Sequence, residues 1–243
     1  AMMNAHIESG ADVTLAYAQE EIPEGLIKPF DVNKDLYYTL DIEDGRVREI
    51  QINPEEPGIQ NLSLNIYIIE RELLISQISA AFVRGYVYFE RDILAPQLDK
   101  LNVRGYKFGG YIARISSIKS YFDENMKLLD EENLDALFGG NHIYTKIRDD
   151  NPTRYIKGAK AKNIMAADGC IIEGEVENSV LFRGVRVGKG AKVKNCVLMQ
   201  DTVIEPGVNV EYIISDKNVT ITADKEIKGT DSFPVYVAKY QVV

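Results

Sequence analysis

Apolar and polar positions in the first half of the chain follow the spacing of strands and helices in turn. Residues 12–17 are largely apolar and partly β-branched, which predicts a buried strand. Residues 36–41 and 46–52 flank Asp44-Gly45, which predicts a hairpin with a tight turn. Further strands are predicted at 62–69 and 103–113, and apolar spacing of three and four predicts helices at 2–8, 70–84, 92–101 and 118–129. Such alternation predicts an α/β layered domain.

The second half has a different period, in which small apolar residues recur at steps of six. Val185, Ala191, Val197 and Val203 form one such series. A six-residue step predicts a solenoid of short parallel strands, with Gly or Asn at the turns. The alternative is a β-sandwich of unrelated strands, whose turns recur without a fixed step. The step slips near residues 175 and 209.

Turn residues gather between these two halves. The segment 139–160 contains Gly139-Gly140-Asn141, Asp149-Asp150-Asn151-Pro152 and Gly158, the composition of a linker. We therefore predict a first domain over 1–138, a linker over 139–160 and a solenoid over 161–243.

Composition narrows the class of protein. The 243 residues are 45% hydrophobic and 27% charged, which argues against a disordered chain, a collagen and a simple coiled coil. The net charge of −9 argues against nucleic acid as the main partner. There is no apolar run of about 20 residues and no signal-peptide pattern. With only Cys170 and Cys196, a reduced, cytoplasmic location is expected.

Few side chains offer chemistry. Neither a Rossmann nor a P-loop glycine motif occurs, and the histidines are His6 and His142, both expected at the surface. Acyltransferases built on hexapeptide solenoids need a histidine base, and none follows His142, so the solenoid is expected to serve packing and assembly. Cys170 and Cys196 fall at small-residue positions of the repeat and are expected to be buried rather than catalytic.

Basic residues cluster on the predicted coils. They form either a solvated face or a site for an anionic effector, and both interpretations stay open. The candidates for an effector site are Arg183, Arg186 and Lys189, with Lys192 and Lys194 nearby.

Two segments resemble the linker and first coils of ADP-glucose pyrophosphorylases, the glucose-1-phosphate adenylyltransferase family. They are 145–155, Thr-Lys-Ile-Arg-Asp-Asp-Asn-Pro-Thr-Arg-Tyr, and 166–174, Ala-Ala-Asp-Gly-Cys-Ile-Ile-Glu-Gly. Residues 178–185 extend the likeness, and 10–14 resemble the middle of the family's catalytic domain. The resemblance implies an α/β plus β fold, with part of a Rossmann-like nucleotidyltransferase domain followed by a left-handed parallel β-helix. It also implies an N-terminally truncated chain, because the family's Gly-rich phosphate loop and first strand have no counterpart here.

The same resemblance implies a degenerate substrate site. Asn53 stands where the family has a phosphate-binding Lys, and Arg114 where it has a metal-binding Asp. Ser63 and Asp92 match sugar-site positions. A cation at Arg114 opposes the Mg²⁺ chemistry of the family. The family pattern therefore implies no catalytic residue, no metal and no cofactor in this chain, with Mg²⁺ serving a catalytic partner.

Three functions remain open at this point. The first, implied by resemblance to the non-catalytic, GlgD-type subunits of glycogen biosynthesis, is a regulatory subunit in a heterotetramer with a catalytic subunit. The second is a divergent but active sugar-phosphate nucleotidyltransferase. The third is a β-helix scaffold or binding module without a link to sugar nucleotides.

Overall fold

A computed structural model describes residues 1–22, 37–54, 58–140, 143–145 and 148–243. Two compact units divide the chain, Ala1–Gly110 and Tyr111–Val243. The sequence pattern placed the boundary at residue 138 instead. The difference arises because helix α3 (Ile118–Lys127) packs Phe122 against Val197 and Ile214 of the repeat, and so belongs with the second unit.

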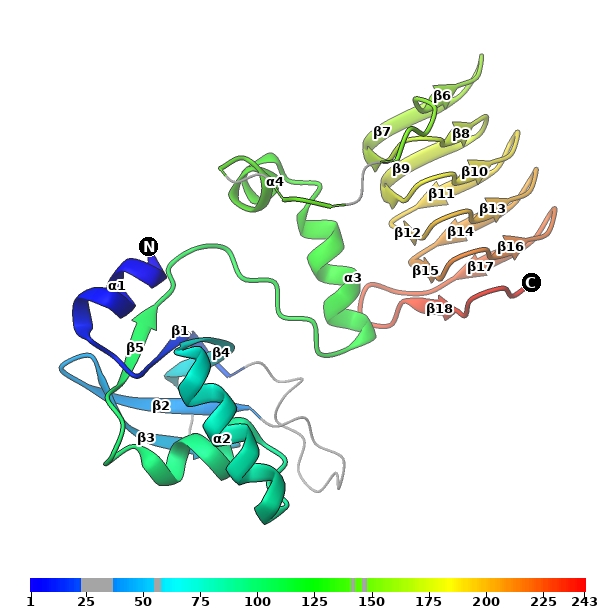
Figure 1. The fold of residues 1–243 in the computed structure, drawn as a ribbon. Coiled ribbons are helices and arrows are strands. Elements are labelled where there is room, and N and C mark those ends of the chain that lie inside the picture. Colours follow the sequence, from blue (N-terminus) through cyan, green and yellow to red (C-terminus); the bar gives the residue numbers. More distant parts are fainter. Residues whose placement is uncertain (23–36, 55–57, 141–142, 146–147) are drawn as a thin grey trace. The chain divides into compact units, whose positions relative to one another are not determined.

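The first unit is a small mixed sheet with helices (Figure 1). Among the described residues of this unit, five strands close on one another in the order β1-β4-β2-β3-β5, and β1 is parallel to β5 but antiparallel to β4. Val13, Leu15, Leu40, Val47 and Val103 fill the interior. The strands are β1 (Val13–Glu21), β2 (Tyr38–Glu43), β3 (Arg46–Ile52), β4 (Ile59–Ile69) and β5 (Val103–Lys107).

The predicted hairpin is confirmed. Asp44 and Gly45 join β2 to β3 with φ of 51° and 76°. Two consecutive positive φ values define the turn that matches the twist of antiparallel strands, and Asp-Gly is among the pairs that tolerate it. The predicted strand at 103–113 ends early, at Lys107, before Gly109-Gly110.

Helices of the first unit follow the predictions in two places out of three. The helices α1 (Met2–Ser9) and α2 (Arg71–Arg84) are confirmed. The helix predicted over 92–101 is wrong as an α-helix. That region holds a π-helical turn, η1 (Phe89–Leu94), and a 3₁₀ turn, η2 (Ala95–Gln97). Pro96 lies in η2 and has no N–H to donate to an α-helical ladder.

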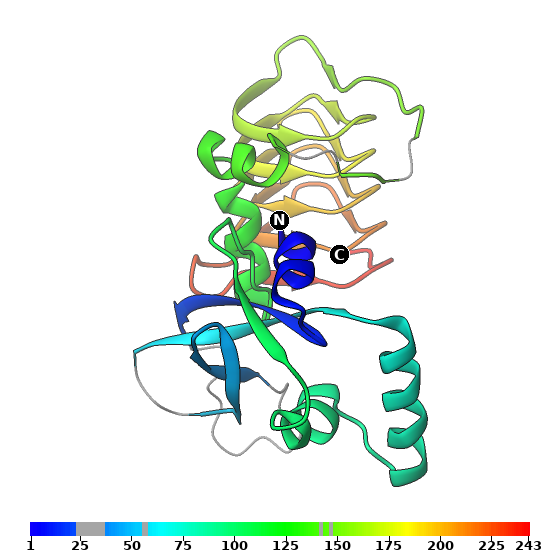
Figure 2. The same ribbon diagram turned by 60° about the vertical axis from the view of Figure 1, so that its left-hand side comes forward.

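The second unit is a parallel β-helix that carries α3 and α4 (Glu131–Phe138) (Figures 1 and 2). Helix α4 was not predicted, although Asp130 caps it by accepting from Glu132 N at 2.9 Å. The coils are built from β6 (Arg154–Tyr155), β7 (Lys160–Ala166), β8 (Ile171–Ile172), β9 (Glu175–Leu181), β10 (Arg186–Val187), β11 (Lys192–Lys194), β12 (Val197–Leu198), β13 (Val203–Ile204), β14 (Asn209–Glu211), β15 (Ile213–Ser215), β16 (Thr220–Ile221), β17 (Glu226–Lys228) and β18 (Val235–Val237).

Strand register shows that the repeat is not a strict multiple of six. Arg186 pairs with Val203 and Val203 with Thr220 in successive coils. Asn178 and Asn195, which bond to each other across two coils, are likewise 17 residues apart. Two of the three corners keep the six-residue step, and the third is one residue shorter. The predicted series is therefore wrong from its third member on, because Cys196 rather than Val197 follows Ala191, and Thr202 rather than Val203 comes next. Its members, fully buried, are Val185, Ala191, Cys196, Thr202 and Val208.

The short corner of each coil holds one residue with left-handed backbone. Asn163, Asn178, Asn195 and Tyr212 occupy it in successive coils, with φ between 45° and 52°. Asparagine is among the residues that adopt this conformation most readily. The slip that the sequence shows near residue 209 reflects this recurring five-residue step.

The slip near residue 175 has another cause. Ile171 pairs with Arg186, a separation of 15 residues that recurs between the bonded side chains of Asn163 and Asn178. This coil therefore lacks two residues, at the corner between β8 and β9. Gly174 lies at that corner, where a Cβ atom would come within 2.7 Å of the Gly188 carbonyl oxygen. Glycine permits this close backbone approach.

No described helix is both long and apolar enough to cross a membrane.

Candidate functional site

Asn53 closes the end of the β2–β3 hairpin. It has a φ of 48°, and its Oδ1 accepts a hydrogen bond from Tyr37 N at 2.9 Å. The Tyr37 hydroxyl donates to the Pro54 carbonyl oxygen at 2.6 Å. Asn53 thus serves the backbone here and adds no positive charge for a phosphate.

Ser63 lies at an irregular point of β4. It pairs with Tyr17 next to a register shift, and it is buried. Its hydroxyl accepts from Asn65 N at 3.2 Å, and Asn65 has a φ of 55°. The Ser63 hydroxyl therefore stabilises a bulge in the strand.

Asp92 organises the turn between α2 and η1. Its Oδ2 accepts from the backbone N–H groups of Val87 and Tyr88 at 2.9 and 3.0 Å, and Arg91 donates to Oδ1 at 2.6 Å. The Arg91 guanidinium, followed by the Tyr88 and Val87 N–H groups, holds the pKa of Asp92 well below its usual range. Within the described residues, no hydrogen bond or ion pair links Asn53, Ser63 and Asp92 to one another.

Glu90, next to Asp92 in the same turn, is a titratable group that the sequence reasoning missed. Its side chain is buried, its Oε1 has no hydrogen-bond partner among the described residues, and burial raises its pKa. Burial and the nearby Glu90 charge also raise the pKa of Tyr38 to about 12. A glutamate is usually exposed, so only the structure could identify Glu90 as buried.

Arg114 belongs to the second unit, in the segment that leads from Tyr111 to α3. The residue is half-buried. A guanidinium is a permanent cation and repels Mg²⁺.

The basic candidates lie around one coil of the β-helix. Arg183 precedes β10, Arg186 lies on it and Lys189 follows it. The Arg183 Nε lies 3.7 Å from Asp150 Oδ2. Lys189 lines a cavity of about 430 Å³ together with Lys157, Glu173 and Glu175, and neither arginine lines it. Opposite charges balance in that cavity, so the three cations do not converge there.

Both cysteines lie in the core of the β-helix. Cys170 and Cys196 are fully buried, and burial raises the pKa of Cys196 to about 12. Thiols held protonated in this way are poor nucleophiles. His6 lies on α1, where its Nδ1 is 2.8 Å from Thr14 Oγ1, and His142 lies outside the described residues.

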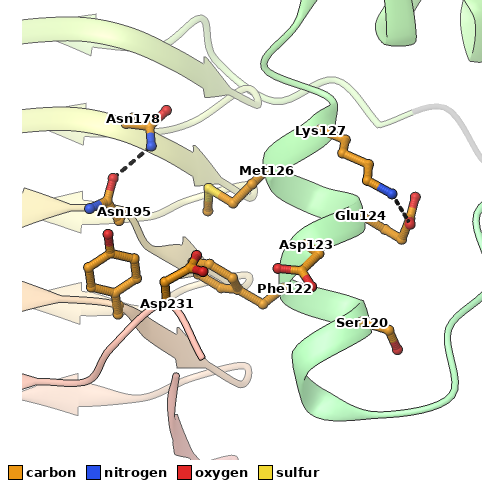
Figure 3. Close-up of a pocket in the computed structure, with 10 residues that line it drawn as sticks. Ser120, Phe122, Asp123, Glu124, Met126, Lys127, Asn178, Asn195 and Asp231 are labelled. Atoms are coloured by element: carbon orange, nitrogen blue, oxygen red, sulfur yellow. Dashed lines mark hydrogen bonds and ion pairs between the residues drawn. The ribbon is translucent and has the colours of Figure 1, made fainter. Parts of the chain in front are cut away.

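A cavity of about 500 Å³ lies between α3 and the short corner of the β-helix (Figure 3). Phe122, Met126 and Asp123 extend from α3 toward the coils, whereas Lys127 turns to Glu124, its partner at 2.7 Å. Sequence reasoning missed this cavity, because its residues come from α3, three coils and a loop. The full lining is Ser120, Phe122, Asp123, Glu124, Met126, Lys127, Asn178, Asn195, Tyr212 and Asp231.

Comparison with known proteins identifies relatives of both halves. Residues 147–233 match the family model described as GlmU-like, C-terminal hexapeptide. The chain is similar to glycogen biosynthesis protein GlgD of Bacillus subtilis (strain 168), with 37% identity over 195 residues, 80% of this chain and 57% of the relative. It is 30% identical over 215 residues to a glucose-1-phosphate adenylyltransferase of Clostridium perfringens (strain 13 / Type A), covering 84% of this chain and 51% of the relative.

A third relative extends the match along the chain. It is the glucose-1-phosphate adenylyltransferase of Clostridioides difficile (strain 630), 31% identical over 245 residues, which covers 99% of this chain and 61% of the relative. This chain therefore spans about half to three-fifths of the length of these curated relatives. The resemblance found in the linker and coil residues is confirmed, and the chain belongs to the family of GlgD and the glucose-1-phosphate adenylyltransferases.

Proposed function

We propose that this chain is part of a regulatory, catalytically silent subunit of glucose-1-phosphate adenylyltransferase in glycogen biosynthesis. The reaction of its catalytic partner joins ATP and glucose 1-phosphate to give ADP-glucose and diphosphate. The names of the relatives support the pathway, since they include GlgD and the adenylyltransferase.

One observation carries the silent part of the proposal. At the positions where the family has side chains that bind phosphate, sugar or metal, this chain has side chains that are unsuited to binding them. Asn53 is neutral and bound to the Tyr37 backbone, and Asp92 is already paired with Arg91. Arg114 does not fit a Mg²⁺ site, because it brings a cation where the metal needs carboxylate oxygen. Mg²⁺ chemistry thus falls to the partner.

A silent subunit can still regulate. If its interface with the catalytic subunit differs between two conformational states, its presence shifts the equilibrium between them. We propose a heterotetramer for this reason, in which the β-helix serves assembly.

The test measures ADP-glucose formation by the full-length protein alone, by the catalytic subunit alone and by the two together. We expect no turnover from the protein alone and a changed rate or effector response in the mixture. Strong turnover without a partner would contradict the proposal and favour the divergent, active enzyme.

Two variants and a binding experiment separate the alternatives. Restoring charge with Asn53→Lys and Arg114→Asp should add little to an enzyme that is already active. Gel filtration of the mixture tests the scaffold alternative. If no complex forms and the partner's activity is unchanged, the scaffold interpretation is correct.

A further inference from the structure

We propose that the cavity between α3 and the short corner of the β-helix binds a neutral saccharide. The volume of about 500 Å³ lies within the range of small-molecule sites. Such sites combine an apolar lining with a few polar groups that fix orientation. The proposed function does not use this cavity. This inference rests on the proposed function only in the choice of sugar for the test.

A row of asparagine side chains ends with a free donor at the cavity. Asn163 Nδ2 donates to Asn178 Oδ1 at 2.8 Å, and Asn178 Nδ2 donates to Asn195 Oδ1 at 2.6 Å. The next residue of the row is Tyr212, which has no amide oxygen to accept from Asn195. Asn195 is 8% exposed, and within the described residues its Nδ2 has no acceptor. A largely buried amide N–H without an acceptor favours a ligand that accepts a hydrogen bond.

Acceptors face the same cavity. Asp231 is exposed in the loop after β17 and has no hydrogen bond or ion pair within the described part of the chain. Asp123 extends toward the coils and is paired with Lys119, whose Nζ lies 2.6 Å from Oδ2. A donor on one side and carboxylates on the other suit hydroxyl groups, which accept and donate.

The balance of charge selects against phosphorylated ligands. Three carboxylates line the cavity, from Asp123, Glu124 and Asp231. Lys127 is the one lysine among the described lining residues, and it is turned to Glu124. Like charges repel at short range, so a phosphate would be disfavoured where a neutral polyol is not.

An apolar surface completes the cavity. Phe122 is buried, Met126 lies one turn further along α3, and the ring of Tyr212 lies 6.1 Å from that of Phe122 between centroids. The C–H face of a pyranose ring matches such a surface, while its hydroxyl groups reach Asn195 and Asp231.

Tyr212 also has an unusual backbone. Its φ is 52°, a region that costs energy for a bulky side chain, whereas asparagine occupies the three preceding corners. Asparagine would adopt this backbone conformation at a lower cost than tyrosine. The presence of tyrosine therefore indicates a role for its side chain. We assign that role to the cavity.

The test is a calorimetric titration of the 243-residue chain with maltose and, separately, with glucose 1-phosphate. Maltose is the probe because the proposed function places the protein in the synthesis of a glucose polymer. We expect maltose to bind at millimolar concentration and glucose 1-phosphate to bind more weakly. Tighter binding of glucose 1-phosphate, or no binding of maltose at millimolar concentration, would overturn the proposal.

Three variants locate the binding. Asn195→Asp keeps the acceptor for Asn178 and removes the free donor, and we expect about a tenfold loss of maltose affinity. Tyr212→Asn continues the asparagine row, so it occupies the donor and removes the ring; we expect a similar loss without unfolding. The matched control is Asn218→Asp, at an exposed corner with φ of 58° outside the cavity, which should bind as the parent does.

Equal maltose affinity in Asn195→Asp and Asn218→Asp would also overturn the proposal. Circular dichroism melts of each variant separate lost binding from lost folding. The titration contains neither partner nor nucleotide. Its failure would therefore leave the proposed function standing, and the failure of the activity assay would leave the sugar site standing.

Discussion

The two units differ in how they bury apolar side chains. In the β-helix, each coil covers its neighbours, and a continuous row of aliphatic side chains from Ile172 to Ile221 is fully buried. In the first unit, α2 buries only Ala81, while Phe82 and Val83 are more than four-fifths exposed. A repeat protein thus obtains its core from contacts between successive coils. A small closed sheet has no such succession, and it leaves one helix face open.

The largest expected effect tests the repetitive core. Leu198 is fully buried between coils, so Leu198→Ala should destabilise the chain by about 3 kcal/mol through the cavity it leaves. Urea unfolding followed by circular dichroism measures the loss. A loss below about 1 kcal/mol would mean that the coils readjust around the gap and that the core is less tightly packed than the structure indicates.

The next effect tests the shortened coil of the repeat. Gly174→Ala adds a Cβ against the carbonyl oxygens of Ala191 and Gly188. Backbone atoms cannot move as a flexible side chain can, so we expect a loss of about 2 kcal/mol. Gly140→Ala is the control, because no described residue other than its chain neighbours has an atom within 4 Å of the Cβ it adds. Equal melting temperatures for the two variants would contradict the packing described at this corner.

A smaller effect tests the buried carboxyl group of the first unit. Burial raises the pKa of Glu90, so as the pH rises from the ordinary glutamate value the folded chain retains a proton that the unfolded chain has lost, and stability falls. Glu90→Gln removes that dependence and should stabilise the chain by about 1 kcal/mol at neutral pH. Urea unfolding of both proteins across a pH series measures the difference.

The pH series decides whether burial is the cause. Below the ordinary pKa of glutamate both states hold the proton, and the advantage of Glu90→Gln should vanish there. The control is Glu49→Gln on the exposed side of β3, which should show no such change. An advantage that persists at acidic pH would point to packing rather than charge.

The smallest effect tests the open helix face. Phe82 is 88% exposed, so Phe82→Ser should change the free energy of unfolding by less than about 0.5 kcal/mol. Removing an exposed aromatic side chain should at the same time raise the concentration at which the chain stays monodisperse in light scattering. A large loss of stability would show that α2 is packed in solution.

The sequence predicted the parts of the fold that follow from local rules. Asp44-Gly45 identified the hairpin, and the recurring aliphatic residues identified the solenoid. The true length of the coils escaped because one corner of each coil is a residue shorter than the other two, and a six-residue count fits short stretches equally well. The cavity escaped for a related reason. Asn178 and Asn195 fit ordinary turn positions in sequence, Tyr212 gives no turn signal, and only the stacking of coils places all three opposite Phe122.

The candidate substrate residues show the other limit. Asn53, Ser63 and Asp92 were chosen by likeness to a family pattern, which compares residue types at matched positions. The structure adds their hydrogen-bond partners, and each of the three satisfies backbone groups of its own neighbourhood. Such local bonds depend on φ values and turn shapes that a residue pattern does not contain.

The shortened coil at Gly174 makes one coil of the solenoid different from the others, so the coils are not interchangeable. In an ideal repeat, any coil could stack on any other, and a chain displaced by one whole turn during folding would satisfy nearly as many hydrogen bonds as the native one. Here a displaced stack would oppose the short coil to a position shaped for a longer one, and its corner would lose the approach of Gly174 to the next turn. The absence of two residues at one corner thus favours a single register in which the coils stack.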